Sequence, residues 1–323
     1  SIPVSGLQSE VSIMANSEME LFNDSDFITL PQGENKGDVM VRPSVSYWSD
    51  VWRRICSDRV AMVSLAVITI IALMAVFAPI LCPYKYETTD LLATNLGPCR
   101  EHWFGTDSLG RDQWARVWVG ARTSLLIGIG GAIVPQIIGI FLGGISGYFG
   151  GWVDMLIMRI IDIGVCIPSL VYVTLIMLWL GSGPVAIVLA IAITGWMDSG
   201  RVVRGRMLQF KNREFVLAAK TQGSSSLRII FRHILPNILG QQVVSISSAI
   251  PGAIFLEAYL SFIGLGIKSP MTSWGQLCQM GASFYRLYPY QLFIPGVFIS
   301  VTILAFYLFG NCLRDALDPH LRN

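Results

Sequence analysis

Hydrophobic runs dominate the chain from residue 60 onward. A helix needs about 20 apolar residues to cross the roughly 30 Å hydrocarbon core of a bilayer. Six segments meet or approach this requirement, and we predict a membrane span for each: 60–81, 123–148, 160–180, 184–197, 238–267 and 290–313. The fourth is short and must borrow residues toward Arg201. The fifth contains Glu257 and a Pro251-Gly252 pair, which predicts a break in its helix.

The basic residues predict the orientation of these spans. With the N-terminus inside the cell, the inside segments hold 15 Lys and Arg residues and the outside segments hold 7. Cytoplasmic loops of membrane proteins carry the excess of Lys and Arg. We therefore predict that both termini are cytoplasmic and that 82–122, 181–183 and 268–289 lie outside. Without the fourth span, the C-terminus would lie outside instead.

Composition supports a membrane protein and excludes a soluble one. Of 323 residues, 53% are hydrophobic and 14% are charged, whereas soluble proteins carry about 25% charged residues. The predicted fold class is therefore all-α and polytopic, with six transmembrane helices. Residues 1–50 differ, because they hold eight acids, two bases and little apolar periodicity. We predict an acidic, disordered cytoplasmic tail over 1–47, without the basic and apolar regions of a signal peptide.

The most basic loop, between the fourth and fifth spans, contains EFVLAAKTQGSSSLRIIFRHILPN. Good helix formers end at Gly223, a natural C-cap, and Ser226 is a natural N-cap for a second helix. A stripe of Leu227, Ile230, Phe231 and Ile234 follows at helical spacing, and Pro236 predicts the stop. Helices this short need a surface to pack against. That surface is either a partner protein or anionic lipid.

The spacing of this loop resembles a known signature. Ala218-Ala219, three residues, Gly223, nine residues and His233-Ile234-Leu235-Pro236 match the pattern of permease subunits in binding-protein-dependent ABC importers. Leu217 stands where the family has Glu, and His233 where it has Ile. In the family this element, 213–236 here, is the coupling helix that docks on a separate ATP-binding subunit. The resemblance implies coupling roles for these residues: Arg213, Glu214, Ala218, Ala219, Gly223, Leu227, Arg228, Phe231, Arg232, Leu235 and Pro236.

Two further segments narrow the resemblance. HWFGTDSLGRDQWARVWVGARTSLL (102–126) and EAYLSFIGLGIKSPMTSWGQL (257–277) are similar to the C-type permease subunit of dipeptide and oligopeptide importers. The implied fold is that of a type I importer, with the first helix and an extracytoplasmic loop in 48–122 and the core permease domain in 123–323. Relatives also carry nickel complexes or glutathione, so these cargoes stay open as alternatives.

The resemblance also implies partners and a location. The partners are a second, homologous permease subunit, two ATPase subunits, an extracytoplasmic substrate-binding protein, a peptide substrate and the lipid bilayer, with no nucleic acid. This chain would bind no cofactor, while the partner subunits would bind ATP and Mg²⁺. The location would be the cytoplasmic membrane of a bacterium or archaeon.

Several residues inside the spans are candidates for function. Glu257 lines a pathway or subunit interface, or else stays hydrated near the membrane surface. Pro251-Gly252 is either a hinge or a tolerated kink. Glycine recurs at every fourth position in Gly139, Gly143, Gly147 and Gly151. Such a row of small residues predicts a close helix contact, either within this chain or with the second permease.

Two enzyme classes are tested by the motifs. The chain has no Gly-Lys-Ser/Thr P-loop, so ATP hydrolysis must reside in another chain. Residues 144–147 form a GxSG sequence of the kind found in rhomboid proteases, but that chemistry needs a nearby histidine. His102, His233 and His320 all lie outside the spans, which disfavours a protease. The chain has no CxxC pair, so the sequence does not indicate a zinc or redox motif. Pairing of Cys82 with Cys99 stays open.

Overall fold

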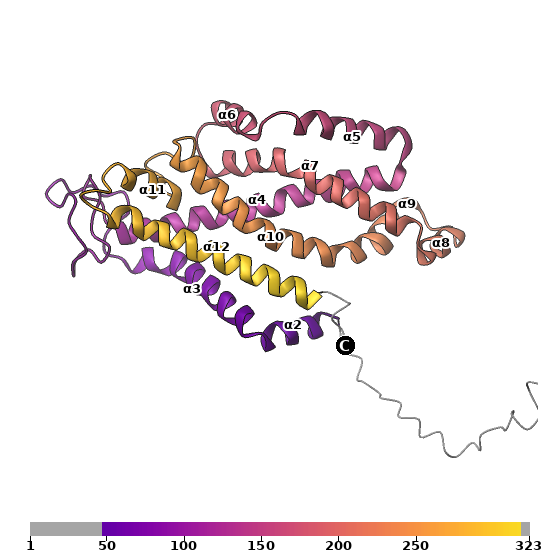
Figure 1. Cartoon of the computed structure of the whole chain (residues 1–323), viewed down its shortest axis with the longest axis horizontal. Helices are drawn as coiled ribbons and strands as arrows, with labels where there is room; N and C mark the ends of the chain where they lie inside the picture. The colour runs from indigo at the N-terminus through magenta and orange to yellow at the C-terminus, as the bar shows by residue number, and fades with distance from the viewer. Residues whose placement is uncertain (1–46, 318–323) are drawn as a thin grey trace, which may run out of the picture. The chain divides into compact units, whose positions relative to one another are not determined.

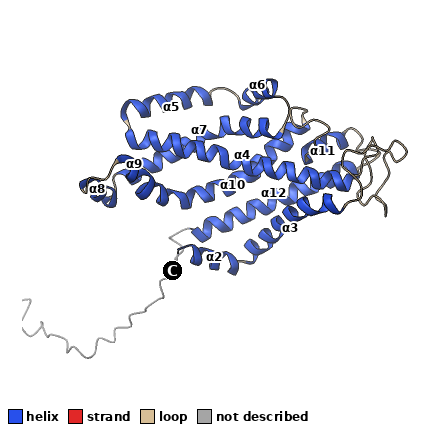
Figure 2. Cartoon of the chain, turned by 180° about the vertical axis from the view of Figure 1, so that it is seen from behind, coloured by secondary structure: helices blue, strands red, loops and turns tan. Residues whose placement is uncertain are grey.

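The chain folds into a bundle of long, nearly aligned helices, which the computed structural model describes for residues 47–317 (Figure 1). In the described part, the only β feature is an isolated bridge between Thr106 and Asp112 (Figure 2). The predicted acidic tail, 1–47, lies outside these residues except for Tyr47. The helices are α2 (Tyr47–Ser57), α3 (Arg59–Leu81), α4 (Gln113–Phe149), α5 (Gly151–Val165), α6 (Ser169–Leu180), α7 (Pro184–Lys211), α8 (Glu214–Thr221), α9 (Ser226–Arg228), the π-helix η2 (Ile229–Ile234), α10 (Leu235–Phe262), α11 (Trp274–Ala282) and α12 (Tyr290–Leu317).

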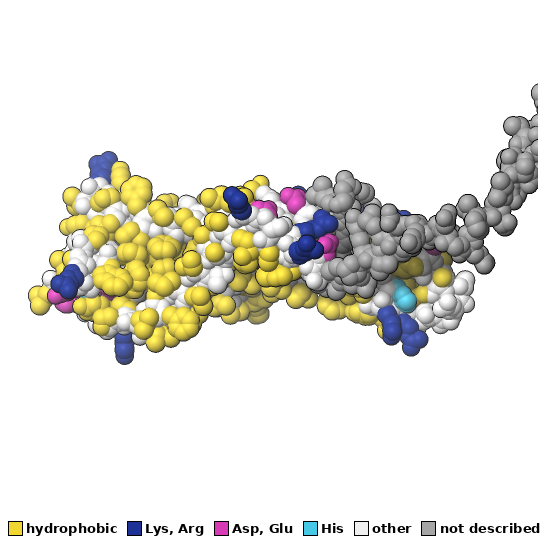
Figure 3. All heavy atoms as spheres, turned by 90° about the horizontal axis from the view of Figure 1, so that it is seen from below, with side chains coloured by type: hydrophobic (Ala, Val, Ile, Leu, Met, Phe, Trp, Pro, Cys, Tyr) yellow, Lys and Arg dark blue, Asp and Glu magenta, His cyan; other side chains and the backbone are white. Residues whose placement is uncertain are grey.

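Five of these segments are long and apolar enough to cross a membrane: α3, α4, α7, α9 to α10, and α12. The bent pair of α5 and α6 brings the number to six if it forms one span. Hydrophobic side chains also dominate the described part of the surface in Figure 3, as expected where lipid is the solvent. The predicted all-α polytopic fold is therefore confirmed.

The second span is longer than predicted, because α4 begins at Gln113 and not near Thr123. Asp112 caps it by accepting a hydrogen bond from the Ala115 amide at 2.7 Å. The early turns contain two arginines that made the sequence look extramembranous. Both are paired: Arg116 bonds Asp107, and Arg122 donates to backbone carbonyls of α3.

The third span is bent, and not the single helix predicted over 160–180. The axes of α5 and α6 differ by 90° across a break at residues 166–168. Pro168 explains the break, because proline lacks an N–H donor and disfavours helical geometry in the residue before it. The fourth span, by contrast, gains length, since α7 runs on through Arg201 to Lys211.

Two predicted helix interruptions are wrong. Pro251 lies inside α10, which continues without a break to Phe262. Pro236 also fails to stop a helix, because the chain passes from α9 through η2 into α10. The π-turn accommodates this proline: the Leu235 amide donates to the carbonyl of Ile230, five residues back, which shifts the register where Pro236 would otherwise clash.

The interior has two main contacts. In the first, α4 packs along α7, with the glycines of α4 against the α7 backbone. In the second, α3, α4, α10 and α12 enclose a core that contains Trp118, Trp274 and Ile254. As Figure 1 shows, α8 and α9 lie at one end of the bundle, while α11 and the long loop between α3 and α4 lie at the other.

Candidate functional site

The 213–236 element forms a short helical hairpin at one end of the bundle. The helix α8 ends in a turn in which Gly223 has φ +76°, a conformation that suits glycine. The amide of Gly223 donates to the Lys220 carbonyl at 3.0 Å, and the amide of Ser224 donates to the Ala219 carbonyl at 3.1 Å. The predicted C-cap at Gly223 thus corresponds to the sharp turn that leads into α9.

The underside of this hairpin is packed on the bundle. Val216 and Ala219 of α8 are buried, as are Ile229, Ile230 and Ile234 of the following turns. They share a hydrophobic cluster whose other members come from α4, α7 and α10: Tyr148, Met207 and Ile238. The hairpin is therefore anchored on the same helices that form the centre of the bundle.

The predicted apolar stripe of the second helix is split between two faces. Ile230 and Ile234 are buried, but Leu227 is 63% exposed and Phe231 is 52% exposed. The π-turn changes the angular spacing after Arg228, so the i, i+3, i+4 pattern of a regular helix no longer keeps these positions together. Leu217, which stands in place of the motif's Glu, is also exposed, with 48% of its surface accessible.

The outer surface of the hairpin is thus apolar and basic. Its exposed hydrophobic side chains are Phe215, Leu217, Leu227 and Phe231. Arg213, Arg228 and Arg232 are exposed among them, and their side chains make no hydrogen bond or ion pair with any described residue. Clustered apolar side chains rimmed by charge are typical of a protein interface. We call this set the hairpin surface. Sequence reasoning noted Leu217 only as the residue in place of the motif's Glu and missed Phe215, because helical periodicity gave no signal for either.

Ionic contacts brace the base of the hairpin. Arg204 of α7 bonds both carboxylate oxygens of Asp154 in α5, at 2.5 and 2.6 Å. Ser146 of α4 donates to the same carboxylate at 2.5 Å. Lys211, at the end of α7, donates to the Tyr148 carbonyl. Three helices are therefore tied together where the hairpin attaches. Ser146, the serine of the GxSG sequence, is engaged with Asp154 and not with a histidine.

The predicted pathway residue Glu257 lies inside the chain. Its side chain is 0% exposed and accepts hydrogen bonds from Ser124 and Ser261, each at 2.9 Å. The Trp274 amide donates to Ser124 at 3.2 Å. The carboxylate therefore joins α4, α10 and the start of α11 and does not face an open cavity.

A different face of α10 is available to another molecule. Gly252, Phe255, Tyr259 and Phe262 are exposed and recur at i, i+3, i+7 and i+10, whereas Pro251 is buried. Phe255, Tyr259 and Phe262 line a shallow groove of about 210 Å³ beside α11. This aromatic stripe was missed in the sequence, because apolar residues surround the whole helix and obscure any one face.

Three of the four ridge glycines lie against α7. A Cβ atom on Gly139 would clash with the Ser199 hydroxyl and lie 2.5 Å from the Ser199 Cβ, and one on Gly143 would lie 2.3 Å from the Gly200 carbonyl oxygen. A Cβ on Gly147 would lie 2.8 Å from the Arg204 carbonyl oxygen. Gly151 differs: it starts α5 at φ +55° with no neighbour within 4 Å.

The loop between α3 and α4, residues 82–112, which we predict to lie outside the cell and call the outer loop, forms a buried ionic cluster. Asp107 bonds Arg111 at 2.8 Å and also Arg116, and all three are almost fully buried. His102 bonds Asp112 at 2.8 Å. Residues 105–112 therefore form a structural element that fixes the start of α4. Cys82 and Cys99 are both free. In the described residues, no group of His, Cys, Asp and Glu side chains is arranged to hold a metal.

Comparison with known proteins identifies the family. Residues 137–323 match the family described as "Binding-protein-dependent transport system inner membrane component". The chain belongs to this family. Residues 46–98 match the "N-terminal TM domain of oligopeptide transport permease C", which covers α2, α3 and part of the outer loop.

Individual relatives of this permease cover almost the whole chain. It is 46% identical to the oligopeptide transport system permease protein OppC of Bacillus subtilis (strain 168), over 90% of this chain and 96% of the relative. It is 42% identical to the dipeptide transport system permease protein DppC of the same organism, over 93% and 94%. It is 40% identical to OppC of Escherichia coli (strain K12), over 88% and 95%.

Proposed function

We propose that this chain is the C-type permease subunit of an ATP-driven importer of short peptides, and that it forms half of the translocation pathway. The dipeptide and oligopeptide names of its relatives support the cargo. The single observation that carries the mechanism is the hairpin surface, which combines exposed apolar and basic side chains with a rigidly packed underside. Such a surface suits a separate ATPase subunit that drives the helices behind it.

The proposed complex has a second permease, two ATPase subunits and an extracytoplasmic binding protein. ATP and Mg²⁺ would be bound by the ATPase subunits. The hairpin surface would be cytoplasmic, and so would both termini. The aromatic stripe of α10 would face the second permease or the pathway, since it is the exposed side of a helix whose opposite side is buried.

The packing suggests how ATPase closure reaches the spans. A displacement of α8 is transmitted to α4 and α7 through Val216, Tyr148 and Met207. The Arg204–Asp154 pair passes it to α5. Because η2 continues directly into α10, the same displacement also tilts the helix that carries the aromatic stripe. Alternating access follows if the stripe closes and opens the pathway as α10 tilts.

Reconstitution of the complete importer in proteoliposomes tests the proposal. Peptide uptake and ATP hydrolysis are measured for the double variant Arg228→Glu/Arg232→Glu and for Gly223→Val, which strains a backbone at positive φ. We expect uptake to fall more than tenfold while the subunits still insert and assemble. Arg286→Glu, in the loop between α11 and α12 at the opposite end of the bundle, is the matched control. Wild-type uptake and ATPase rates in the hairpin variants would refute the coupling role, and competition by Ni²⁺ complexes or glutathione but not by peptides would refute the cargo.

A further inference from the structure

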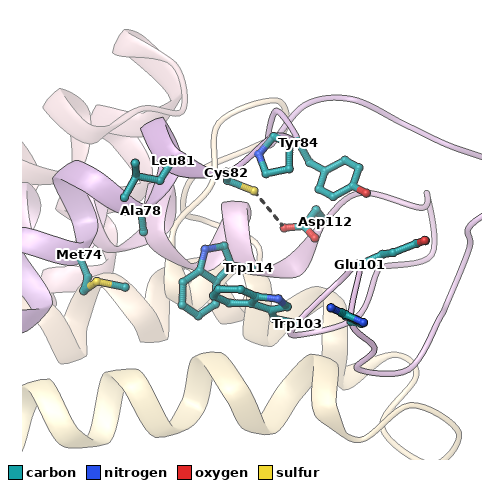
Figure 4. Close-up of a pocket in the computed structure, with 11 residues that line it drawn as sticks. Met74, Ala78, Leu81, Cys82, Tyr84, Glu101, Trp103, Asp112 and Trp114 are labelled. Atoms are coloured by element: carbon teal, nitrogen blue, oxygen red, sulfur yellow. Dashed lines mark hydrogen bonds between the residues drawn. The ribbon is translucent and has the colours of Figure 1, made fainter.

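A pocket of about 470 Å³ lies where the end of α3 meets the outer loop and the start of α4 (Figure 4). We call it the outer pocket. Its inner part is lined by Met74, Ala78 and Leu81, which recur at i, i+4 and i+7 on one side of α3. Leu81 lies seven positions after Met74, so the pocket extends roughly 10 Å along the helix axis from the end of the span.

Two tryptophans form the wall opposite α3. The rings of Trp103 and Trp114 meet edge to face with centroids 4.8 Å apart, and both line the pocket (Figure 4). Trp103 is 62% exposed although it is a large hydrophobic residue. Tryptophan is enriched where hydrocarbon gives way to headgroups. The aromatic wall therefore lies at the depth where an amphiphile changes from tail to head.

Opposite charges stand together at the rim. Arg100 and Glu101 line the pocket, are exposed and make no hydrogen bond or ion pair with a described residue. The third charged group, Asp112, is already engaged, because it accepts from His102 at 2.8 Å and from the Ala115 amide at 2.7 Å. The rim thus offers one free cation and one free anion above an apolar cavity.

The pocket adjoins surface that faces lipid. Phe77, Ile80 and Leu81 at the end of α3 are 53%, 70% and 80% exposed, and Leu81 belongs to both this surface and the pocket. A ligand can therefore enter from the bilayer. A peptide from the aqueous phase would have to place its backbone polar groups against apolar walls without hydrogen bonds, which is costly.

We propose that the outer pocket binds a phospholipid with a zwitterionic, primary-amine headgroup. Its phosphate pairs with Arg100, its ammonium pairs with Glu101, and one acyl chain lies between the tryptophans and the Met74–Ala78–Leu81 stripe of α3. The lipid fixes the outer loop against α3, and so supports the buried ionic cluster that starts α4.

The test uses the assembled importer in vesicles doped with phosphatidylethanolamine that carries a photoactivatable diazirine in one acyl chain. Cross-links are mapped by mass spectrometry. We expect them to concentrate on the outer pocket, and Arg100→Gln or Glu101→Gln to lower labelling there by about two- to fivefold, as for a partly exposed ion pair. Lys85→Gln, an exposed charge on the same loop that does not line the pocket, should leave labelling unchanged.

Two further comparisons make the outcome decisive. Ala78→Phe fills the pocket and should abolish its cross-links, whereas Ile80→Phe on the neighbouring lipid-facing side should not. Unlabelled phosphatidylethanolamine should compete better than phosphatidylglycerol, which lacks the ammonium. Labelling spread evenly along α3 in every variant, or equal competition by the two lipids, would overturn the proposal and leave only non-specific boundary lipid. If Ala78→Phe fails to assemble, the charge variants still decide between these results.

Discussion

The close approach of α4 to α7 makes a quantitative prediction at Gly143. A methyl group there would lie 2.3 Å from the carbonyl oxygen of Gly200 and 3.0 Å from its Cα. The obstacle is backbone, which cannot rotate aside as a side chain can. An ordinary carbon–oxygen contact is about 1 Å longer, so Gly143→Ala must push the two helices apart along their whole interface.

Two effects oppose each other in this substitution. Replacing glycine by alanine inside a helix favours folding by up to about 1 kcal/mol. Forced overpacking of a tight interface costs about 1–3 kcal/mol. The neighbouring residue separates these terms, because a methyl group on Gly144 would lie 3.4 Å from the Met207 methyl, an ordinary contact. Gly144→Ala therefore keeps the helix gain without the clash. Because both variants share that gain, they should differ by the cost of the clash alone, about 1–3 kcal/mol.

Thermal unfolding of the purified, detergent-solubilised chain measures this difference. We expect Gly144→Ala to unfold at or slightly above the wild-type midpoint. Gly143→Ala should unfold several degrees lower, since about 1 kcal/mol shifts the midpoint of a chain of this size by about 2–4 °C. Equal midpoints for the two alanine variants would show that α4 and α7 do not meet at Gly143, and the argument from backbone contact would fail.

Three further predictions concern buried polar groups and accessible thiols. Glu257→Gln should destabilise the chain only slightly, because interhelical hydrogen bonds in membranes contribute about 0.6 kcal/mol each. Glu257→Ala should cost about 1–3 kcal/mol, because it leaves the serine hydroxyls without a partner. Equal melting temperatures of the two variants would contradict the hydrogen-bonding role. Arg122→Leu should leave the Ala75 carbonyl unpaired, since Pro79 cannot donate to it, and adding Pro79→Ala should restore part of the lost stability in a double-mutant cycle. Burial raises the pKa of Cys82. At neutral pH, a membrane-impermeant maleimide applied outside should therefore modify exposed Cys99 faster than Cys82, and the labelling rate of Cys82 should increase as the pH is raised. Labelling of Cys99 only from the inside would reverse the proposed orientation.

The sequence was sufficient to predict where most spans lie, because membrane insertion depends on length and apolar composition. It could not locate the start of α4. Arg116 and Arg122 look like residues outside the membrane until their partners are known. One partner is the Asp107 carboxylate of the outer loop, and the other is a pair of carbonyls in α3. Such contacts follow from tertiary structure, and local hydropathy does not record them.

The hairpin illustrates the same limit at the candidate site. Turn chemistry correctly located the corner at Gly223, since a positive φ demands a particular residue type. The faces of the second helix were predicted wrongly, because they depend on the π-turn that admits Pro236. The π-turn arises because a proline does not fit inside a regular helix. Sequence rules therefore predict that the helix ends at the proline. In the folded chain the helix continues, and its hydrogen-bond register changes instead.

The two sides of α10 have different surroundings, and Glu257 lies on the side that is buried within this chain. A carboxylate at membrane depth is costly unless it is paired or solvated. Here the hydroxyls of serines in α4 and α10 donate hydrogen bonds to it. The opposite, aromatic side of α10 stays largely exposed, with Phe255 63%, Tyr259 44% and Phe262 48% accessible. Because the Ser124–Glu257 hydrogen bond joins α4 to α10, we expect the two helices to move together. In the proposed mechanism, a displacement at the hairpin surface therefore reaches Phe255, Tyr259 and Phe262, which we propose face the second permease or the pathway.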